Sequence, residues 1–183
     1  MTVEIIQNGD PLLRKTSKEV PVESIAKPKI QKILTEMNEA LDSQHDGVAI
    51  AAPQIGVNLR IFIISGKVFN DDFMRGAPLP LKNEISKKIH PNLIFINPII
   101  KKISKDKKLM DEGCLSVRPI YGKVRRATKS TVEAYNEKGK KFIKDGSGLI
   151  AHIFQHEIDH LDGILFIDKA KNLREFPLEE NSN

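Results

Sequence analysis

The strongest constraint on this chain is the run of residues 155–160, which reads Gln-His-Glu-Ile-Asp-His and contains the pattern H-E-x-x-H. His156 and His160 are four positions apart, so on a helix they differ by about 40° around the axis and about 6 Å along it. Both imidazoles can therefore reach one metal ion from the same face. Glu157 lies one step further round, where its carboxylate can accept a proton from a water beside the metal. The pattern predicts a helical metal site suited to hydrolysis.

Residues 147–162, which surround this motif, have the apolar periodicity of a helix. The apolar positions are Leu149, Ile150, Ile153, Ile158 and Leu161. Ser147 is expected to cap the start of the helix, and Gly163 is expected to end it. The metal motif therefore falls in the second half of the helix.

The rest of the chain predicts an α+β fold. Residues 28–44 have the apolar spacing of an amphipathic helix. Strand-like runs cover residues 59–64, 93–103, 131–135 and 141–144. Residues 47–56 are rich in small side chains, and Pro53 argues against a central strand there. We therefore predict mostly antiparallel sheets packed around a central metal-binding helix, with an amphipathic helix near the N-terminus.

The length of 183 residues, of which 40% are hydrophobic, fits one domain with its own core. We predict a single catalytic domain over residues 1–183, with a core at 5–168 and a short tail at 169–183. Residues 65–92 form a connection that is unusually long for a compact domain. Such a loop is either a cover for a substrate cleft or a tolerated surface insertion, and both interpretations stay open.

The composition disfavours several classes of protein. No stretch approaches 18 apolar residues, and residues 1–20 lack the features of a secretory or transit peptide. The chain has one cysteine, which fits a reducing compartment, and we expect a cytoplasmic protein that does not bind a membrane. The net charge is +5, but the lysine runs at residues 101–108 and 138–144 lie beside acidic residues. We interpret them as turn or edge-strand surfaces and expect no dedicated nucleic-acid site.

A catalytic metal usually has three protein ligands and one open position, so two imidazoles are too few. Metzincin proteases use a His six residues after the second His, and Phe166 stands at that position. Thermolysin-like proteases use a Glu from a following helix, but Glu175, Glu179 and Glu180 lie in a tail that contains a proline. Cys114 remains as a candidate, although a lone Cys is more often a buried structural thiol.

Two further motifs accompany the histidine motif. Residues 47–54 read Gly-Val-Ala-Ile-Ala-Ala-Pro-Gln, and residues 112–116 read Glu-Gly-Cys-Leu-Ser. With residues 155–160 they resemble the three signatures of the peptide deformylases, in the family's order and over most of the chain. The sequence departs from the family at Ala49, where a second Gly is usual, and at Arg118-Pro119, where Pro-Gly is more usual. These departures put rate and side-chain preference in question more than activity.

This resemblance implies a hydrolase that removes the formyl group from the N-terminal formylmethionine of newly made polypeptides and releases formate. It implies that Cys114, His156 and His160 bind the metal, with water in the fourth position, and that Glu157 moves the protons. A divalent ion ensures that the thiol binds as a thiolate. The implied ion is Fe²⁺, with Ni²⁺ or Co²⁺ able to replace it, whereas one Cys and two His also suit Zn²⁺. The implied partners are N-formylmethionyl peptides and nascent chains, with transient ribosome contact.

The resemblance also implies how substrate is held. The carboxamide of Gln54 and the backbone N–H of Leu115 match donors to the formyl oxygen, where charge develops. The residues expected to bind substrate are Gly47, Val48, Ala49, Glu112, Gly113, Leu149, His152 and Ile153. His152 cannot share a metal with His160, because the two are about 12 Å apart along the helix. We predict that His152 lies at the rim of the methionine pocket.

Two rival functions are a zinc-type metalloendopeptidase, which would cleave internal peptide bonds, and a basic binding protein with a structural metal. A structural site is closed by four ligands, whereas three are found here beside an acidic residue. The structural-metal hypothesis is therefore the weaker one.

Overall fold

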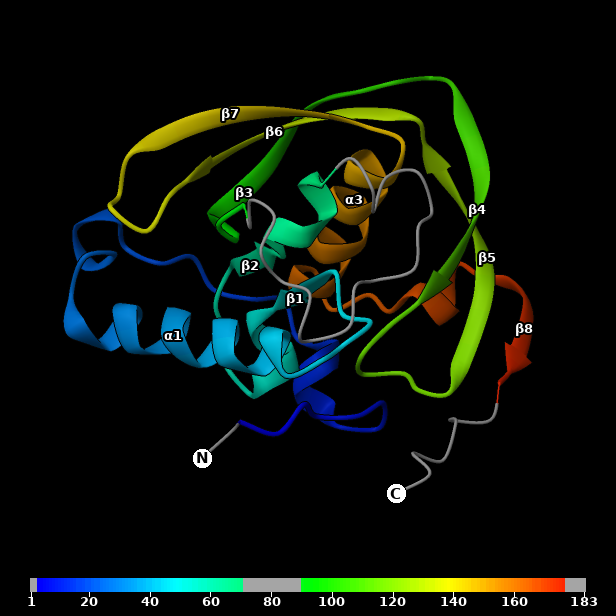
Figure 1. Cartoon of the computed structure of the whole chain (residues 1–183), viewed down its shortest axis with the longest axis horizontal. Coiled ribbons are helices and arrows are strands. Elements are labelled where there is room, and N and C mark those ends of the chain that lie inside the picture. Colours follow the sequence, from blue (N-terminus) through cyan, green and yellow to red (C-terminus); the bar gives the residue numbers. More distant parts are fainter. Residues whose placement is uncertain (1–2, 71–89, 177–183) are drawn as a thin grey trace.

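Two antiparallel sheets and two α-helices make up most of residues 3–70 and 90–176, the part of the chain that the computed structural model describes (Figure 1). The larger sheet has the order β1-β2-β3-β6-β7 and consists of β1 (Ala49–Ala51), β2 (Ile61–Ile64), β3 (Leu93–Ile103), β6 (Lys129–Tyr135) and β7 (Lys141–Ser147). The smaller sheet has the order β4-β5-β8 and consists of β4 (Lys107–Gly113), β5 (Ile120–Ala127) and β8 (Lys171–Glu175). The helices are α1 (Pro28–Asp42) and α3 (Leu149–Leu161). The α+β class with antiparallel sheets is confirmed.

Short 3-10 helices connect these elements. They are η1 (Pro11–Arg14), η2 (Val22–Ser24), η3 (Ala52–Ile55), η4 (Gly66–Phe69) and η5 (Phe166–Asp168). The tight turn η3 follows β1 directly, and Pro53 lies in its first turn, where its missing N–H cannot continue the strand. No helix among the described residues has both the length and the apolar character needed to cross a membrane.

The larger sheet is covered on both faces, which explains why β2 is apolar at every position. Ile61 and Ile63 pack in one buried cluster with the apolar face of α1. Phe62 and Ile64 point to the opposite face and pack in a second cluster with α3. All four side chains are fully buried. The position of α3 is thereby tied to the centre of the larger sheet.

The helix α3 lies between the two sheets and contacts both (Figure 1). It packs against β1, β2, β6 and β7 on one side and reaches β5 on the other. Phe154 anchors it, because this ring lies 5.3 Å from the ring of Phe95 and 6.4 Å from that of Phe62. The other side of α3, which carries the histidine motif, is left facing the smaller sheet.

The start of α3 differs from the prediction. Ser147 is the last residue of β7, and Gly148 occupies the N-cap position with φ of 54°. A positive φ suits glycine because a Cβ would be strained there. The chain therefore passes from β7 into α3 within one residue, and Ser147 was wrongly predicted as the cap.

The prediction of a tail from residue 169 is also wrong in part. Residues Lys171–Glu175 form β8, which pairs antiparallel with β5. All five side chains of β8 are exposed, so the sequence has no alternating apolar pattern that would predict this strand. Of the predicted loop at residues 65–92, the stretch 71–89 lies outside the described residues, so the loop hypothesis stays a prediction. Lys107 and Lys108 lie in β4, an edge strand, as their charge indicated.

Candidate metal centre and its pocket

Two segments that are distant in sequence bring the predicted ligands together. Cys114 directly follows β4, whereas His156 and His160 lie on α3. The Cys114 Sγ is 3.1 Å from His160 Nε2. One donor atom from each of these three residues lies within 4.8 Å of the other two. They form a compact group that can hold one metal ion.

The chemistry of these donors fits a divalent transition metal. A Glu112 oxygen lies 2.8 Å from His156 Nδ1 and, as a carboxylate, can only accept, so Nδ1 carries the proton and Nε2 is left with its lone pair. Burial lowers the pKa of His160 well below its ordinary value. The neutral form of His160, which is the form that binds metals, is therefore favoured. One thiolate and two imidazoles are a common ligand set for such ions.

Glu112 is the centre of a buried hydrogen-bond network. Its two oxygens accept from His152 Nε2 at 2.5 Å, from His156 Nδ1 at 2.8 Å, and from two nitrogens of Arg126 at 2.6 and 3.0 Å. Burial by itself raises the pKa of Glu112, but hydrogen bonds from His152, His156 and Arg126 outweigh burial and lower the pKa far below its ordinary value. Glu112 is thus a buried carboxylate that orients the imidazole of His156, a candidate metal ligand.

His152 does not lie at the rim of the pocket, as was predicted. Its side chain is buried, and its Nε2 donates to Glu112. The prediction was wrong because the sequence gives no sign that a buried carboxylate lies opposite this face of α3. His152 is nevertheless part of the pocket wall.

Glu157 has the environment of a general base. Its side chain is buried, and its Oε2 has no hydrogen-bond partner among the described residues. Burial raises the pKa of Glu157 to about 7, and the charge of Glu112 acts in the same direction. A carboxylate with this pKa can both take and return a proton near neutral pH.

Gln54 is held in one orientation by the turn that follows β1. Its Oε1 accepts from the backbone N–H of Ala51 at 2.8 Å, so the other end of the amide must be the NH₂ group. This Nε2 donates to Ser116 Oγ at 3.1 Å and lies 3.5 Å from Cys114 Sγ. The amide donor therefore points toward Cys114, one of the candidate metal ligands.

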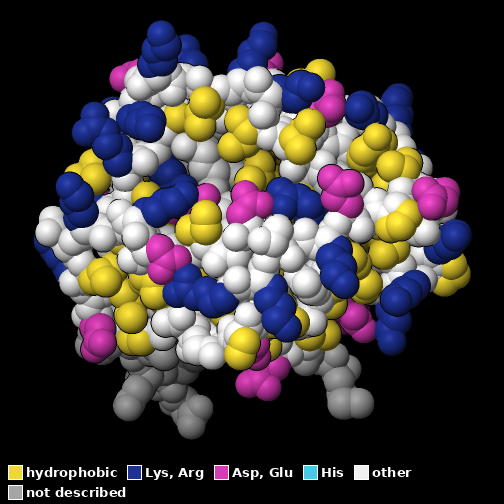
Figure 2. Space-filling view, turned by 180° about the vertical axis from the view of Figure 1, so that it is seen from behind, with side chains coloured by type: hydrophobic (Ala, Val, Ile, Leu, Met, Phe, Trp, Pro, Cys, Tyr) yellow, Lys and Arg dark blue, Asp and Glu magenta, His cyan; other side chains and the backbone are white. Residues whose placement is uncertain are grey.

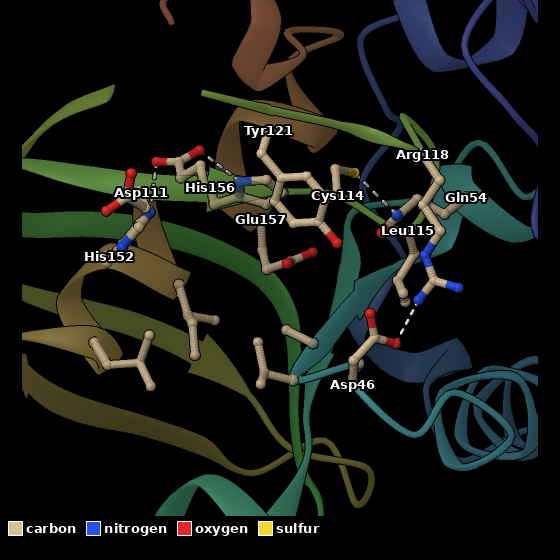
Figure 3. A pocket seen from close by; sticks show the side chains of 17 residues that line it. Asp46, Gln54, Asp111, Cys114, Leu115, Arg118, Tyr121, His152, His156 and Glu157 are labelled. Carbon is tan, nitrogen blue, oxygen red and sulfur yellow. Dashed lines mark hydrogen bonds and ion pairs between the residues drawn. The ribbon is translucent and has the colours of Figure 1, made fainter. Parts of the chain in front are cut away.

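Cys114, His156 and Glu157 line a cavity of about 320 Å³ (Figure 3). Every residue predicted to bind substrate lies in its wall, as do Gln54, Leu115 and Glu157. Four further lining residues had not been predicted, namely Asp46, Asp111, Arg118 and Tyr121. Arg118 donates to Asp46 at 2.5 Å, and Figure 3 shows this ion pair at the opposite end of the cavity from His152.

The sequence also did not predict that Arg126 and Asp159 belong to the hydrogen-bond network around Glu112. Arg126 Nη1 donates to Asp159 at 2.6 Å, while Nε and Nη2 donate to Glu112. Lys169 donates to the same Asp159 carboxylate at 2.7 Å. Asp159 stands inside the histidine motif, which is a signal that could have been used, whereas Arg126 is one of many basic residues and has no local signature.

Comparison with known proteins gives one consistent family. The family described as Polypeptide deformylase matches residues 2–176. The chain is 43% identical over 171 residues to the peptide deformylase of Desulfitobacterium hafniense, covering 92% of this chain and 94% of that protein. It is 37% identical to the chloroplastic peptide deformylase 1A of Solanum lycopersicum, covering 91% of this chain but spanning only 58% of that longer protein.

A solved structure is similar throughout. The Met-Ala-Ser-bound class I type b peptide deformylase of Acinetobacter baumannii superposes with a TM-score of 0.76 at 27% identity. The match covers 92% of this chain and 99% of that one.

Proposed function

The chain belongs to the polypeptide deformylase family, and on that premise we propose that Cys114, His156 and His160 hold its catalytic metal while Glu157 transfers the protons. Members of the family are hydrolases that remove the formyl group from the N-terminus of newly made polypeptides, and this chain is such a hydrolase. The observation that carries the assignment of residues is the compact group of Cys, His and His donors beside a buried carboxylate.

The metal supported by the family resemblance is Fe²⁺, although the same ligands also suit Zn²⁺, Ni²⁺ and Co²⁺. When bound, such an ion supplies a Lewis acid for the formyl oxygen and makes water a stronger nucleophile. The remaining steps depend on side chains and backbone groups of this chain.

Glu157 accepts a proton from the water whose oxygen attacks the formyl carbon. The tetrahedral intermediate then collapses, the bond between the formyl carbon and the methionine nitrogen breaks, and Glu157 returns the proton to that nitrogen. The products are formate and a free N-terminal amine. The raised pKa of Glu157 supports its roles as base and as acid. A group with a pKa near neutral can take a proton from water and can also release it to the amine nitrogen.

Gln54 donates to the formyl oxygen as negative charge develops on it, together with the backbone N–H of Leu115. The bond from Ala51 N–H to Gln54 Oε1 sets the direction of the donor before substrate arrives. Such preorganised donors stabilise the transition state because they need not reorient during the reaction.

The methionine side chain enters the apolar part of the cavity. Val48, Leu149 and Ile153 provide this lining. The peptide backbone passes Gly47, Ala49 and the residues around Gly113. That the Acinetobacter baumannii relative is solved with Met-Ala-Ser bound supports a substrate that begins with methionine.

The zinc-type metalloendopeptidase alternative gains no support from the comparisons, and we do not propose it. A cytoplasmic location and transient contact with the ribosome stay predictions.

The test is to incubate anaerobically purified protein with formyl-Met-Ala-Ser and measure formate together with free N-terminal amine. Acetyl-Met-Ala-Ser and unformylated Met-Ala-Ser serve as matched controls. We expect one formate for each new amine and no products from internal bonds. Absence of formate with metal-loaded protein, or cleavage between the amino acids, would overturn the proposal.

A further inference from the structure

An exposed aromatic pair lies beside the cavity. The ring centroids of Tyr121 and Phe176 are 5.5 Å apart, and the ring planes meet at 81°. Tyr121 is 37% exposed and Phe176 is 51% exposed. Neither ring belongs to the three buried apolar clusters of the described residues. We call this pair the aromatic shelf.

The position of the aromatic shelf is determined by strand pairing and by Gly113. Tyr121 is paired with Gly113 of β4 on one side and with Arg174 of β8 on the other. A Cβ on Gly113 would lie 2.5 Å from the Tyr121 ring, so the ring can lie over β4 only because residue 113 has no side chain. Phe176 is anchored by its N–H, which donates to the carbonyl of Pro119 at 3.1 Å.

The shelf is continuous with the proposed substrate site. Tyr121 lines the same cavity as Gly113, Cys114 and Glu157, and Figure 3 shows its ring projecting over that cavity. Phe176 packs against Tyr121 edge to face and extends the apolar surface outward. The apolar surface therefore begins in the wall of the cavity and ends on an exposed ring.

The charged groups at this part of the cavity are already paired with one another. Arg118 binds Asp46, and Lys123 lies 3.5 Å from Asp111. A side chain that follows the methionine thus meets two satisfied ion pairs and one exposed apolar surface. Burial against that surface is the favourable interaction that remains available.

We propose that the aromatic shelf binds an apolar side chain from one of the two residues that follow the N-terminal methionine, and so sets a preference among formylated peptides. Tyr121 makes the contact, and Phe176 is a positioning residue that supports the Tyr121 ring. This inference rests on the proposed function, because it takes formylated peptides as the substrates.

The experiment compares formyl-Met-Ala-Ser with formyl-Met-Phe-Ser and formyl-Met-Ala-Phe. With the wild-type protein we expect at least one phenylalanine peptide to have kcat/KM about fivefold higher, through a lower KM. Tyr121→Ala and Phe176→Ala are each expected to bring that ratio close to one, and Phe176→Tyr is expected to restore it. Leu173→Ala is the matched control, because Leu173 is an equally exposed apolar residue of β8 outside the cavity wall.

The possible outcomes distinguish a failure of the shelf proposal from a failure of the proposed function. Formate release without any preference for phenylalanine would overturn the shelf while leaving deformylation intact. The same conclusion would follow if Phe176→Ala lowered kcat/KM equally for all three peptides, or if Leu173→Ala removed the preference as well. No formate from any peptide would instead count against the proposed function.

Discussion

His156 donates its Nδ1–H to a Glu112 oxygen 2.8 Å away, so the nitrogen left to bind a metal is Nε2. Glu112 stands two residues before Cys114, at the end of β4. A single short segment of chain therefore supplies one candidate ligand and the group that orients another. A carboxylate that accepts a hydrogen bond from the second ring nitrogen fixes the tautomer and the orientation of an imidazole that binds a metal.

Replacing Glu112 by Gln is expected to weaken metal binding by about 10- to 100-fold, because a carboxamide cannot accept from all three of its donors. Its NH₂ group would face another N–H group from His152, His156 or Arg126. Metal affinity can be measured by competition with a chelator of known affinity. Asp111→Asn is the matched control on the same strand, since the Asp111 side chain is 81% exposed. Equal affinity in Glu112→Gln and the control would refute the orienting role.

Replacing Arg126 by Leu is expected to destabilise the fold by about 3–5 kcal/mol, because it leaves the buried charge of Glu112 without its cationic partner. Both side chains of this pair are almost completely buried, so water cannot replace the lost bonds. Urea unfolding followed by circular dichroism measures the loss. The neighbouring exposed Arg125→Leu is expected to change stability by less than about 0.5 kcal/mol. A loss below about 1 kcal/mol in Arg126→Leu would show that the pair is not important for stability.

The division of labour between ligands and base gives a third prediction. Ala at Cys114, His156 or His160 is expected to abolish stoichiometric metal, as read by elemental analysis of purified protein. Glu157→Gln is expected to retain the metal but to lower kcat for deformylation by about 10²- to 10⁴-fold. Metal kept at wild-type affinity in Cys114→Ala would show that the third ligand is another residue.

The proposed Fe²⁺ ion predicts sensitivity to oxygen, because oxidation of the iron or of the Cys114 thiolate disrupts the ligation. Iron-loaded protein exposed to air is expected to lose activity over time, while protein loaded with Zn²⁺ is expected to keep its activity. Formate release after timed exposure is the measurement. Unchanged activity of the iron form would argue against Fe²⁺ or against access of oxygen to it.

Features with a local period could be predicted from the sequence. The apolar pattern of residues 93–103 corresponds to β3, and the run at 131–135 lies within β6. The four-residue spacing of His156 and His160 places both on α3. In each case the geometry of one helix or strand determines where the side chains lie, whatever packs around it.

The three-stranded sheet was not predicted, because its strands carry polar residues on an exposed face. In β4 only Glu112 is fully buried, and in β8 no residue is buried. Without apolar alternation, pairing is determined by neighbouring strands rather than by local preference.

The sequence by itself determined the chemistry, because the spacing of the histidine motif and the two short motifs specifies which donor groups and which carboxylate are present. Only the tertiary structure decided how they are supported. Arg126 reaches Glu112 because β5 pairs with β4, and Glu112 reaches His156 because α3 packs across both sheets. Such contacts depend on distances between separate elements, which no local pattern encodes. For the same reason the packing of Phe176 on Tyr121 could not be predicted from the sequence, because this contact forms only when β8 pairs with β5.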